Sequence, residues 1–135
     1  MTTFSSLGAM TIPLGQFVAA FVLFEIKHLL ADYILQSNWM ASGKQERSDW
    51  LVPLCAHSLV HALGTFAIAL AIEPRLWWIA LADFLVHASI DRLKGKVVAL
   101  GRLTREQPVY WWVFGADQQL HGLTNLALAL ILVTG

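Results

Sequence analysis

The stretch KHLLADYI, residues 27–34, places three ionisable side chains, Lys27, His28 and Asp32, in a segment that is otherwise apolar. His28 and Asp32 are four residues apart, and Glu25 precedes His28 by three. On an α-helix, side chains three or four residues apart lie on one face, about one turn from each other. The stretch therefore predicts an apolar helix with one polar face that carries Glu25, His28 and Asp32, while Lys27 points toward a neighbour or the interface.

Three later segments each carry a pair of side chains with the same spacing of four. Together the pairs use all five histidines of the chain: His28 and Asp32, His57 and His61, His87 and Asp91, Asp117 and His121. Asp83 precedes His87 by four residues and extends the third pair. One such pair in each of four helices predicts a shared polar site between them.

The helices themselves are predicted from four long apolar stretches, at about residues 13–35, 51–72, 75–96 and 109–133. Each reaches the roughly 20 residues that a helix needs to cross a bilayer. A proline lies at or near the start of each stretch, where its missing N–H costs little: Pro13, Pro53, Pro74 and Pro108. With 57% hydrophobic and 13% charged residues, the chain is predicted to be an all-α integral membrane four-helix bundle, up-down-up-down, with four transmembrane helices in a single domain over residues 1–135.

The basic residues predict the orientation, because Lys and Arg of short loops stay on the cytoplasmic side. Most of them fall in the stretches 36–50 and 92–108, whereas the turn at 73–75 holds only Arg75. We therefore expect both termini outside, and a first helix that is not part of a cleaved signal peptide. The formal net charge of zero gives no overall basic field and argues against a nucleic-acid partner.

The pairs are predicted to meet at one depth, because they come late in the first and third helices and early in the second and fourth. Aspartates inside an apolar span are costly unless a cation or a proton pathway offsets them. We predict a metal site with one or two ions, zinc first and iron or manganese as alternatives, and a proton-relay or hydrogen-bond network as the competing interpretation. The predicted ligands are His28, Asp32, His57, His61, His87, Asp91, Asp117 and His121, with Asp83 and Glu25 as candidate general bases.

The motifs HLLADYILQS, HSLVH, HASIDRLK and DQQLH together resemble a family of small bacterial membrane proteins catalogued as domain of unknown function 3307. The resemblance covers about residues 25–125. It implies a multi-pass protein of the bacterial inner (cytoplasmic) membrane and no assigned activity. More loosely, the paired His and Asp residues are similar to those of inner-membrane proteins labelled metal-dependent hydrolases.

Three functions fit these residues. The first is a metal-dependent hydrolase acting from the cytoplasmic leaflet on an anionic, lipid-like substrate whose head group Arg92 and Lys94 hold, although ordinary positive-inside topology also explains these two residues. The second is a divalent-metal transporter or metal-binding accessory protein, for which a homodimer is expected. The third is a di-iron oxidative enzyme, because EIKH has the Glu-x-x-His spacing of carboxylate-bridged bundles.

Overall fold

The computed structural model describes residues 11–135, so most of the N-terminal segment to which the signal-peptide prediction refers lies outside the described residues. The described residues are helical, with no strand among them. The elements are α2 (Leu14–Tyr33), α3 (Asn38–Gly43), α4 (Leu51–Ile72), the 3-10 helix η1 (Pro74–Leu76), α5 (Ile79–Leu100) and α6 (Pro108–Thr134). The predicted all-α fold is confirmed.

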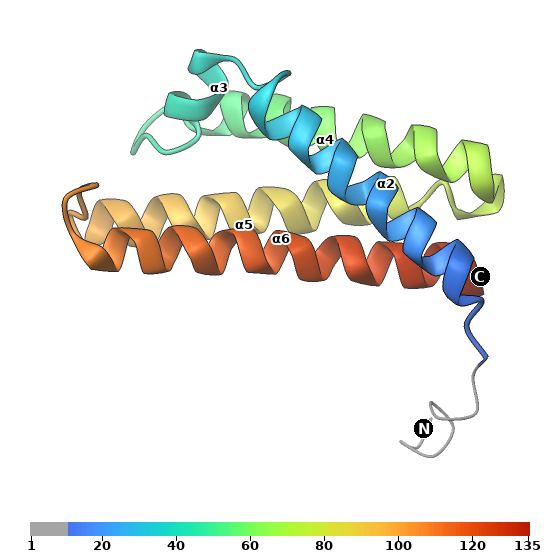
Figure 1. Cartoon of the computed structure of the whole chain (residues 1–135). Helices are drawn as coiled ribbons and strands as arrows, with labels where there is room; N and C mark the ends of the chain where they lie inside the picture. Colours follow the sequence, from blue (N-terminus) through green and yellow to red (C-terminus); the bar gives the residue numbers. More distant parts are fainter. Residues whose placement is uncertain (1–10) are drawn as a thin grey trace, which may run out of the picture.

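The four long helices run alternately up and down and pack in a ring (Figure 1). Helix α2 packs against α4 and α6, and α5 packs against the same two helices on the opposite side. Helix α2 crosses the others obliquely, and its start lies near the C-terminus and the turn between α4 and α5 (Figure 1). Helix α3 and the loop between α5 and α6 lie at the other end, which we call the α3 end (Figure 1).

Two predicted boundaries need correction. Residues 36–50 were expected to form a loop, but they contain the short helix α3, whose first turn is capped by the Ser37 side chain accepting from the Met40 N–H. The third helix was expected at 75–96, but α5 spans Ile79–Leu100. Pro74 begins η1 rather than the long helix, and Glu73 caps this turn by accepting from the Arg75 backbone N–H.

The turn at the end of the bundle opposite α3 carries an ion pair between the exposed Arg75 and the half-buried Glu73. Arg75 Nε donates to Glu73 Oε1 at 2.8 Å. The hydrogen bond from this guanidinium lowers the pKa of the Glu73 carboxyl from its usual value. Because the turn is short, it holds α4 and α5 as antiparallel neighbours.

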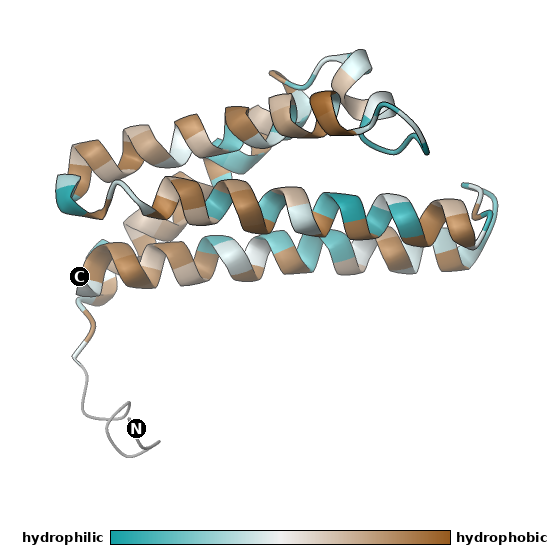
Figure 2. Cartoon of the chain, turned by 180° about the vertical axis from the view of Figure 1, so that it is seen from behind, coloured by the Kyte–Doolittle hydropathy of each residue, from teal (hydrophilic) through white to brown (hydrophobic). Residues whose placement is uncertain are grey.

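The bundle has an apolar half and a polar half (Figure 2). The apolar core lies toward the C-terminal end and is formed by Ala20, Phe24, Ala69, Ile79, Leu128, Ala129 and Leu132. Hydrophilic residues gather in the middle of the bundle and toward the α3 end (Figure 2). The fold therefore places the predicted polar site between the apolar core and α3.

By length and composition, two helices of the described chain are apolar enough to cross a membrane, α2 and α4. Four such helices were expected. Helices α5 and α6 are as long, but they carry more polar residues, and several of these are buried: Asp83, His87, Asp91, Asp117, His121 and Asn125. A polar residue lowers the mean hydropathy of a helix equally whether it faces the bundle interior or the outside.

Candidate metal centre

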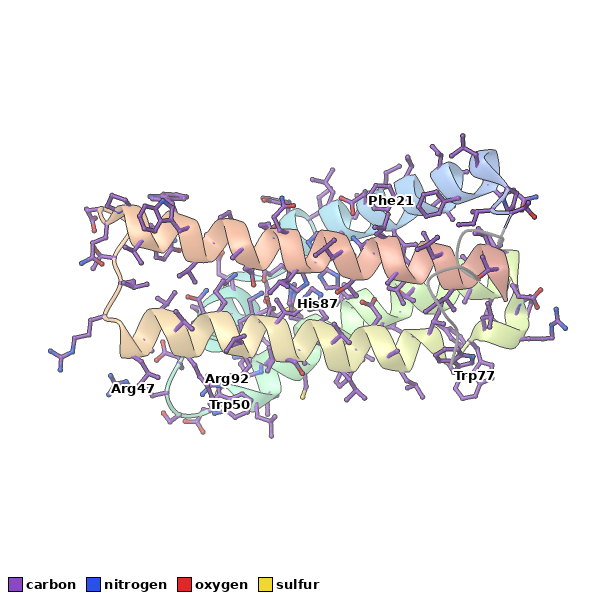
Figure 3. All side chains as sticks on the ribbon, turned by 90° about the horizontal axis from the view of Figure 1, so that it is seen from below. Phe21, Arg47, Trp50, Trp77, His87 and Arg92 are labelled. Carbon is purple, nitrogen blue, oxygen red and sulfur yellow. The ribbon has the colours of Figure 1, made fainter. Side chains whose placement is uncertain are left out.

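The four long helices bring all eight predicted ligands together. They form three overlapping groups whose donor atoms lie within 4.8 Å of one another: Asp32, His57, His61 and His87; His28, His87 and His121; Asp91, Asp117 and His121. His57, His61, His87, Asp91, Asp117 and His121 are at most 3% exposed. Figure 3 shows His87 in the interior of the bundle, about midway along its helix. The spacing of four explains the convergence, because each helix contributes two side chains from one face.

The first group is built around the Asp32 carboxylate of α2. Its Oδ1 lies 3.0 Å from His61 Nε2 and 3.2 Å from His57 Nε2, both on α4. His57 Nε2 in turn lies 3.2 Å from His87 Nε2 on α5. Three helices thus direct four donor atoms at one point.

The second and third groups share His121 of α6. Its Nε2 lies 3.4 Å from Asp91 Oδ1 and 3.6 Å from Asp117 Oδ1. The His28 ring lies 5.1 Å from the His121 ring, centroid to centroid. His28 Nε2 is buried and lies 3.1 Å from Asp32 Oδ2, which links His28 to the first group.

These distances fit a metal ion of the size of zinc. Ligands 2.0–2.1 Å from a tetrahedral ion are separated from each other by roughly 3.3 Å. Three of the six separations between donor atoms in the first group, 3.0 to 3.2 Å, are close to that edge, and all six are within 4.8 Å. Two Nε2 atoms 3.2 Å apart must share either a proton or a cation, because two lone pairs repel. The donor set of imidazoles and carboxylates is one that zinc, iron and manganese accept.

Two lysines accompany Asp91 and Asp117, the carboxylates of the third group. Lys44 Nζ, from the end of α3, lies 2.7 Å from Asp91 Oδ2, and Lys94 Nζ, from α5, lies 3.0 Å from Asp117 Oδ2. Lys44 is only 5% exposed. Its role could not be predicted from the sequence, since its partner lies 47 residues away. A lysine in a predicted loop gives no signal that it reaches a buried carboxylate.

The two predicted general bases lie outside the ligand groups. Asp83 Oδ2 accepts from Lys27 Nζ at 2.9 Å and from Thr65 Oγ1 at 2.6 Å, so its carboxylate is already engaged in a buried ion pair. Glu25 Oε1 accepts from Asn125 Nδ2 at 2.9 Å. Glu25 lines a cleft between α2 and α6 that also reaches His28, so of the two it is the one with access to the ligands.

The residues predicted to hold a head group have other partners. Lys94 Nζ of α5 pairs with the Asp117 carboxylate of α6 at 3.0 Å. The Arg92 guanidinium lies 3.9 Å from the centre of the Trp50 ring and donates to the Glu46 carbonyl; Figure 3 shows the two side chains together. Both side chains therefore have partners within the chain, and their binding of a head group stays a prediction.

The centre is closed on one side and open on the other. Toward the C-terminal end, the Lys27–Asp83 pair and the apolar core lie beyond the ligands. Toward the α3 end, Asp32 and Asp91 line a cavity of about 180 Å³ together with residues of α3 and α6. The ligands are therefore reached from the end that carries α3 and, at His28, through the cleft between α2 and α6 that Glu25 lines.

Comparison with known proteins identifies the family. Residues 20–134 match the family described as Protein of unknown function (DUF3307), and the chain belongs to it. No curated protein and no solved structure matches the chain. The resemblance inferred from the four motifs is confirmed, and the matched range includes every residue of the candidate centre.

Proposed function

We propose that this chain is a membrane-embedded hydrolase that depends on one or two divalent metal ions and acts at the cytoplasmic leaflet on an anionic, lipid-like substrate. The observation that carries the proposal is the convergence of five imidazoles and three carboxylates from four helices at one buried point that opens toward the α3 end. A cluster of this kind is not needed to hold a helical bundle together.

The distribution of polarity supports four membrane-spanning helices. Among the described residues, buried polar or charged side chains outnumber buried hydrophobic ones by 13 to 11. Large hydrophobic side chains are exposed along all four long helices, for example Leu29, Leu63, Leu85 and Leu123. A soluble protein has the reverse arrangement, and rarely exposes so much contiguous apolar surface.

Tryptophans at both ends of the bundle agree with this orientation across a bilayer. Figure 3 shows Trp50 toward the α3 end and Trp77 at the opposite end. Indole rings favour the two membrane–water interfaces. The basic residues of the loops at the α3 end favour a cytoplasmic orientation of that end, and with it of the opening of the centre, in a bacterial inner membrane.

Two ions suit the ligand count. Asp32, His57, His61 and His87 supply one tetrahedral set, and Asp91, Asp117 and His121 supply three ligands of a second, with His28 beside them. Zinc is the first choice because its structural and catalytic sites use these donors. The chemistry such an ion supplies is the activation of a water molecule at neutral pH.

The protein's own groups would complete the reaction. Glu25, in the cleft that reaches His28, is our candidate to accept the proton of the attacking water. Lys44 and Lys94 hold the outer oxygens of Asp91 and Asp117, which orients these carboxylates in the way that outer partners orient metal ligands elsewhere.

Transport is less well supported than hydrolysis. A transporter must expose its ions to both sides in turn, but the Lys27–Asp83 pair and the apolar core lie beyond the ligands. The di-iron alternative is also less well supported, because Glu25 of the EIKH motif accepts a hydrogen bond from Asn125 and belongs to none of the three ligand groups.

The proposal is tested by elemental analysis of the detergent-purified protein by mass spectrometry. We expect one to two equivalents of zinc per chain in the wild type and a loss of at least one equivalent in the double variant His57→Ala, His61→Ala. Ser58→Ala is the matched control, because Ser58 is buried on the same helix between the two histidines and is no ligand. A folded wild type without metal after supplementation would overturn the proposal, and zinc uptake into liposomes would favour transport.

A further inference from the structure

The cavity at the α3 end brings three basic side chains to the mouth of the metal centre. Lys44 of α3, Lys94 of α5 and Arg105 of the loop before α6 line it, together with the ligands Asp32 and Asp91. The α6 helix begins at Pro108, between Arg105 and the lining residue Tyr110, and its N-cap makes no side-chain hydrogen bond. A helix N-terminus adds partial positive charge to this wall.

The three basic groups keep unused donors. An ammonium has three N–H donors, and the structure gives Lys44 and Lys94 one carboxylate partner each. Within the described residues, the Arg105 side chain makes no hydrogen bond or ion pair, and its guanidinium can bind a phosphate with two parallel bonds. The cavity therefore combines unfilled cationic donors with direct access to two predicted ligands.

The charge of the centre points to the same kind of ligand. The centre holds three carboxylates and two ammonium groups, those of Asp32, Asp91, Asp117, Lys44 and Lys94. Their charges sum to minus one. Two divalent ions would change this sum to plus three. Burying such an excess is costly. A dianion together with a hydroxide would neutralise it.

We propose that Lys44, Lys94 and Arg105 form a subsite for the phosphoryl group of a phosphate monoester, a proposal that rests on the proposed function and names its substrate class. The substrate's phosphorus then lies between these donors and the carboxylates Asp32 and Asp91. In the reaction, the water oxygen forms a new bond to phosphorus, the ester P–O bond breaks, and a proton from the water ends on the leaving alcohol. The products are inorganic phosphate and the alcohol.

The size of the cavity limits the head group. About 180 Å³ is room for about six water molecules at their share of liquid volume. This volume accepts a phosphoryl group with its attacking water but not a sugar–diphosphate head group. A monoester is also the phosphate ester that carries the two negative charges the centre needs.

A neighbouring groove suggests where the alcohol part lies. Between α5 and α6, a groove of about 190 Å³ shares Lys94 with the cavity and is otherwise lined mainly by apolar residues such as Leu93, Val97 and Val113. The acyl or prenyl chain of a lipid phosphate would fit this wall, whereas a soluble monoester would leave it empty.

The test is isothermal titration of the zinc-loaded, detergent-purified protein, freed of excess zinc, with inorganic phosphate and with dihexanoyl phosphatidic acid. Dihexanoyl phosphatidylcholine controls for the chains. We expect both phosphates to bind and Arg105→Gln to weaken both at least tenfold. Phosphatidic acid binding at least tenfold tighter than phosphate would assign the source to lipids, and equal affinities would assign it to a soluble monoester.

Arg102→Gln is the matched control, because Arg102 is exposed in the same loop but does not line the cavity. We expect it to change the affinity less than twofold. No phosphate binding to zinc-loaded protein, or equal losses in the two arginine variants, would overturn the subsite alone. A wild type that holds no metal would instead overturn the proposed function, so the zinc content of each sample distinguishes the two failures.

Discussion

At the scale of single residues, the Lys27–Asp83 pair is the clearest case of a buried charge with a structural partner. Thr65 donates to the same carboxylate oxygen, and all three side chains are buried. Gly64 makes room for the lysine, because a Cβ there would lie 2.6 Å from Lys27 Cγ. The pair closes the centre toward the apolar core without belonging to a ligand group.

Lys27→Met tests this role. The variant leaves the Asp83 carboxylate buried without its cation, which typically destabilises a protein by about 3–5 kcal/mol. We expect a clear fall in the melting temperature in detergent and no loss of zinc per folded chain. Adding Asp83→Leu should restore most of the stability, since an apolar pair replaces a buried ion pair at little cost. A loss of zinc from the folded single variant would show that the pair belongs to the metal centre.

The ligands themselves were predictable from the sequence, whereas their counter-ions were not. A spacing of four is enough to place His57 and His61 on one face of α4, because helical geometry alone fixes that relation. Lys44 and Asp91 meet only because the segment that follows α3 lies beside α5. No local pattern around Lys44 encodes that contact.

At the scale of elements, α3 is the part that delivers Lys44. The six-residue helix packs against the start of α4 with Gly43 at the contact, where a Cβ would lie 2.6 Å from Pro53 Cγ. Gly95 of α5 faces the next residues, with the Gln45 Cα 3.5 Å from the position of its missing Cβ. Gly43 therefore lets the α3 segment approach α4 closely, whereas a Cβ at Gly95 would make only ordinary van der Waals contact.

Gly43→Ala should therefore displace α3. Forcing a methyl group into this contact costs typically about 1–3 kcal/mol, and the shift moves Lys44 away from Asp91. We expect phosphate affinity to fall severalfold while zinc content stays unchanged, measured by titration and elemental analysis on one preparation. Gly115→Ala is the control, because its Cβ would meet nothing within 4 Å, and alanine favours a helix by up to about 1 kcal/mol.

An unchanged phosphate affinity in a folded Gly43→Ala protein would show that α3 does not position the subsite.

The role of α3 could not be predicted from the sequence, since the pattern of residues 36–50 indicates a loop. Proline positions located the starts of α4 and α6 well, but Pro74 opens a separate short helix, η1, because Glu73 caps it there. The start of α5 was therefore predicted four residues too early.

At the scale of the whole molecule, hydropathy and burial give different answers about the membrane. Hydropathy marks α2 and α4 as spans, whereas α5 and α6 keep their polar residues, such as Asp91 and His121, on the inside. A bundle with a polar interior and an apolar exterior can expose all four helices to lipid. The mean hydropathy of a helix does not distinguish its inward face from its outward face, so the number of membrane spans needs a direct measurement.

Cysteine labelling in the background Cys55→Ala provides that measurement. Single variants Ser48→Cys, Arg75→Cys and Glu106→Cys place an exposed thiol in each of the three connections between long helices. With four spans and the basic loops inside, a membrane-impermeant maleimide should label only Arg75→Cys in intact spheroplasts. The other two variants should react only after lysis.

The Glu106→Cys variant decides between the two arrangements. If only α2 and α4 crossed the bilayer, residues 75 and 106 would lie on the same side, and both would react in intact spheroplasts. Four crossings put them on opposite sides, because α5 then returns the chain to the cytoplasm. The latter result also fixes the open end of the metal centre, since Arg105 and Lys44 line that cavity from the same side as residue 106. Labelling of Ser48→Cys and Glu106→Cys in intact cells, without Arg75→Cys, would reverse the orientation and require a substrate from outside.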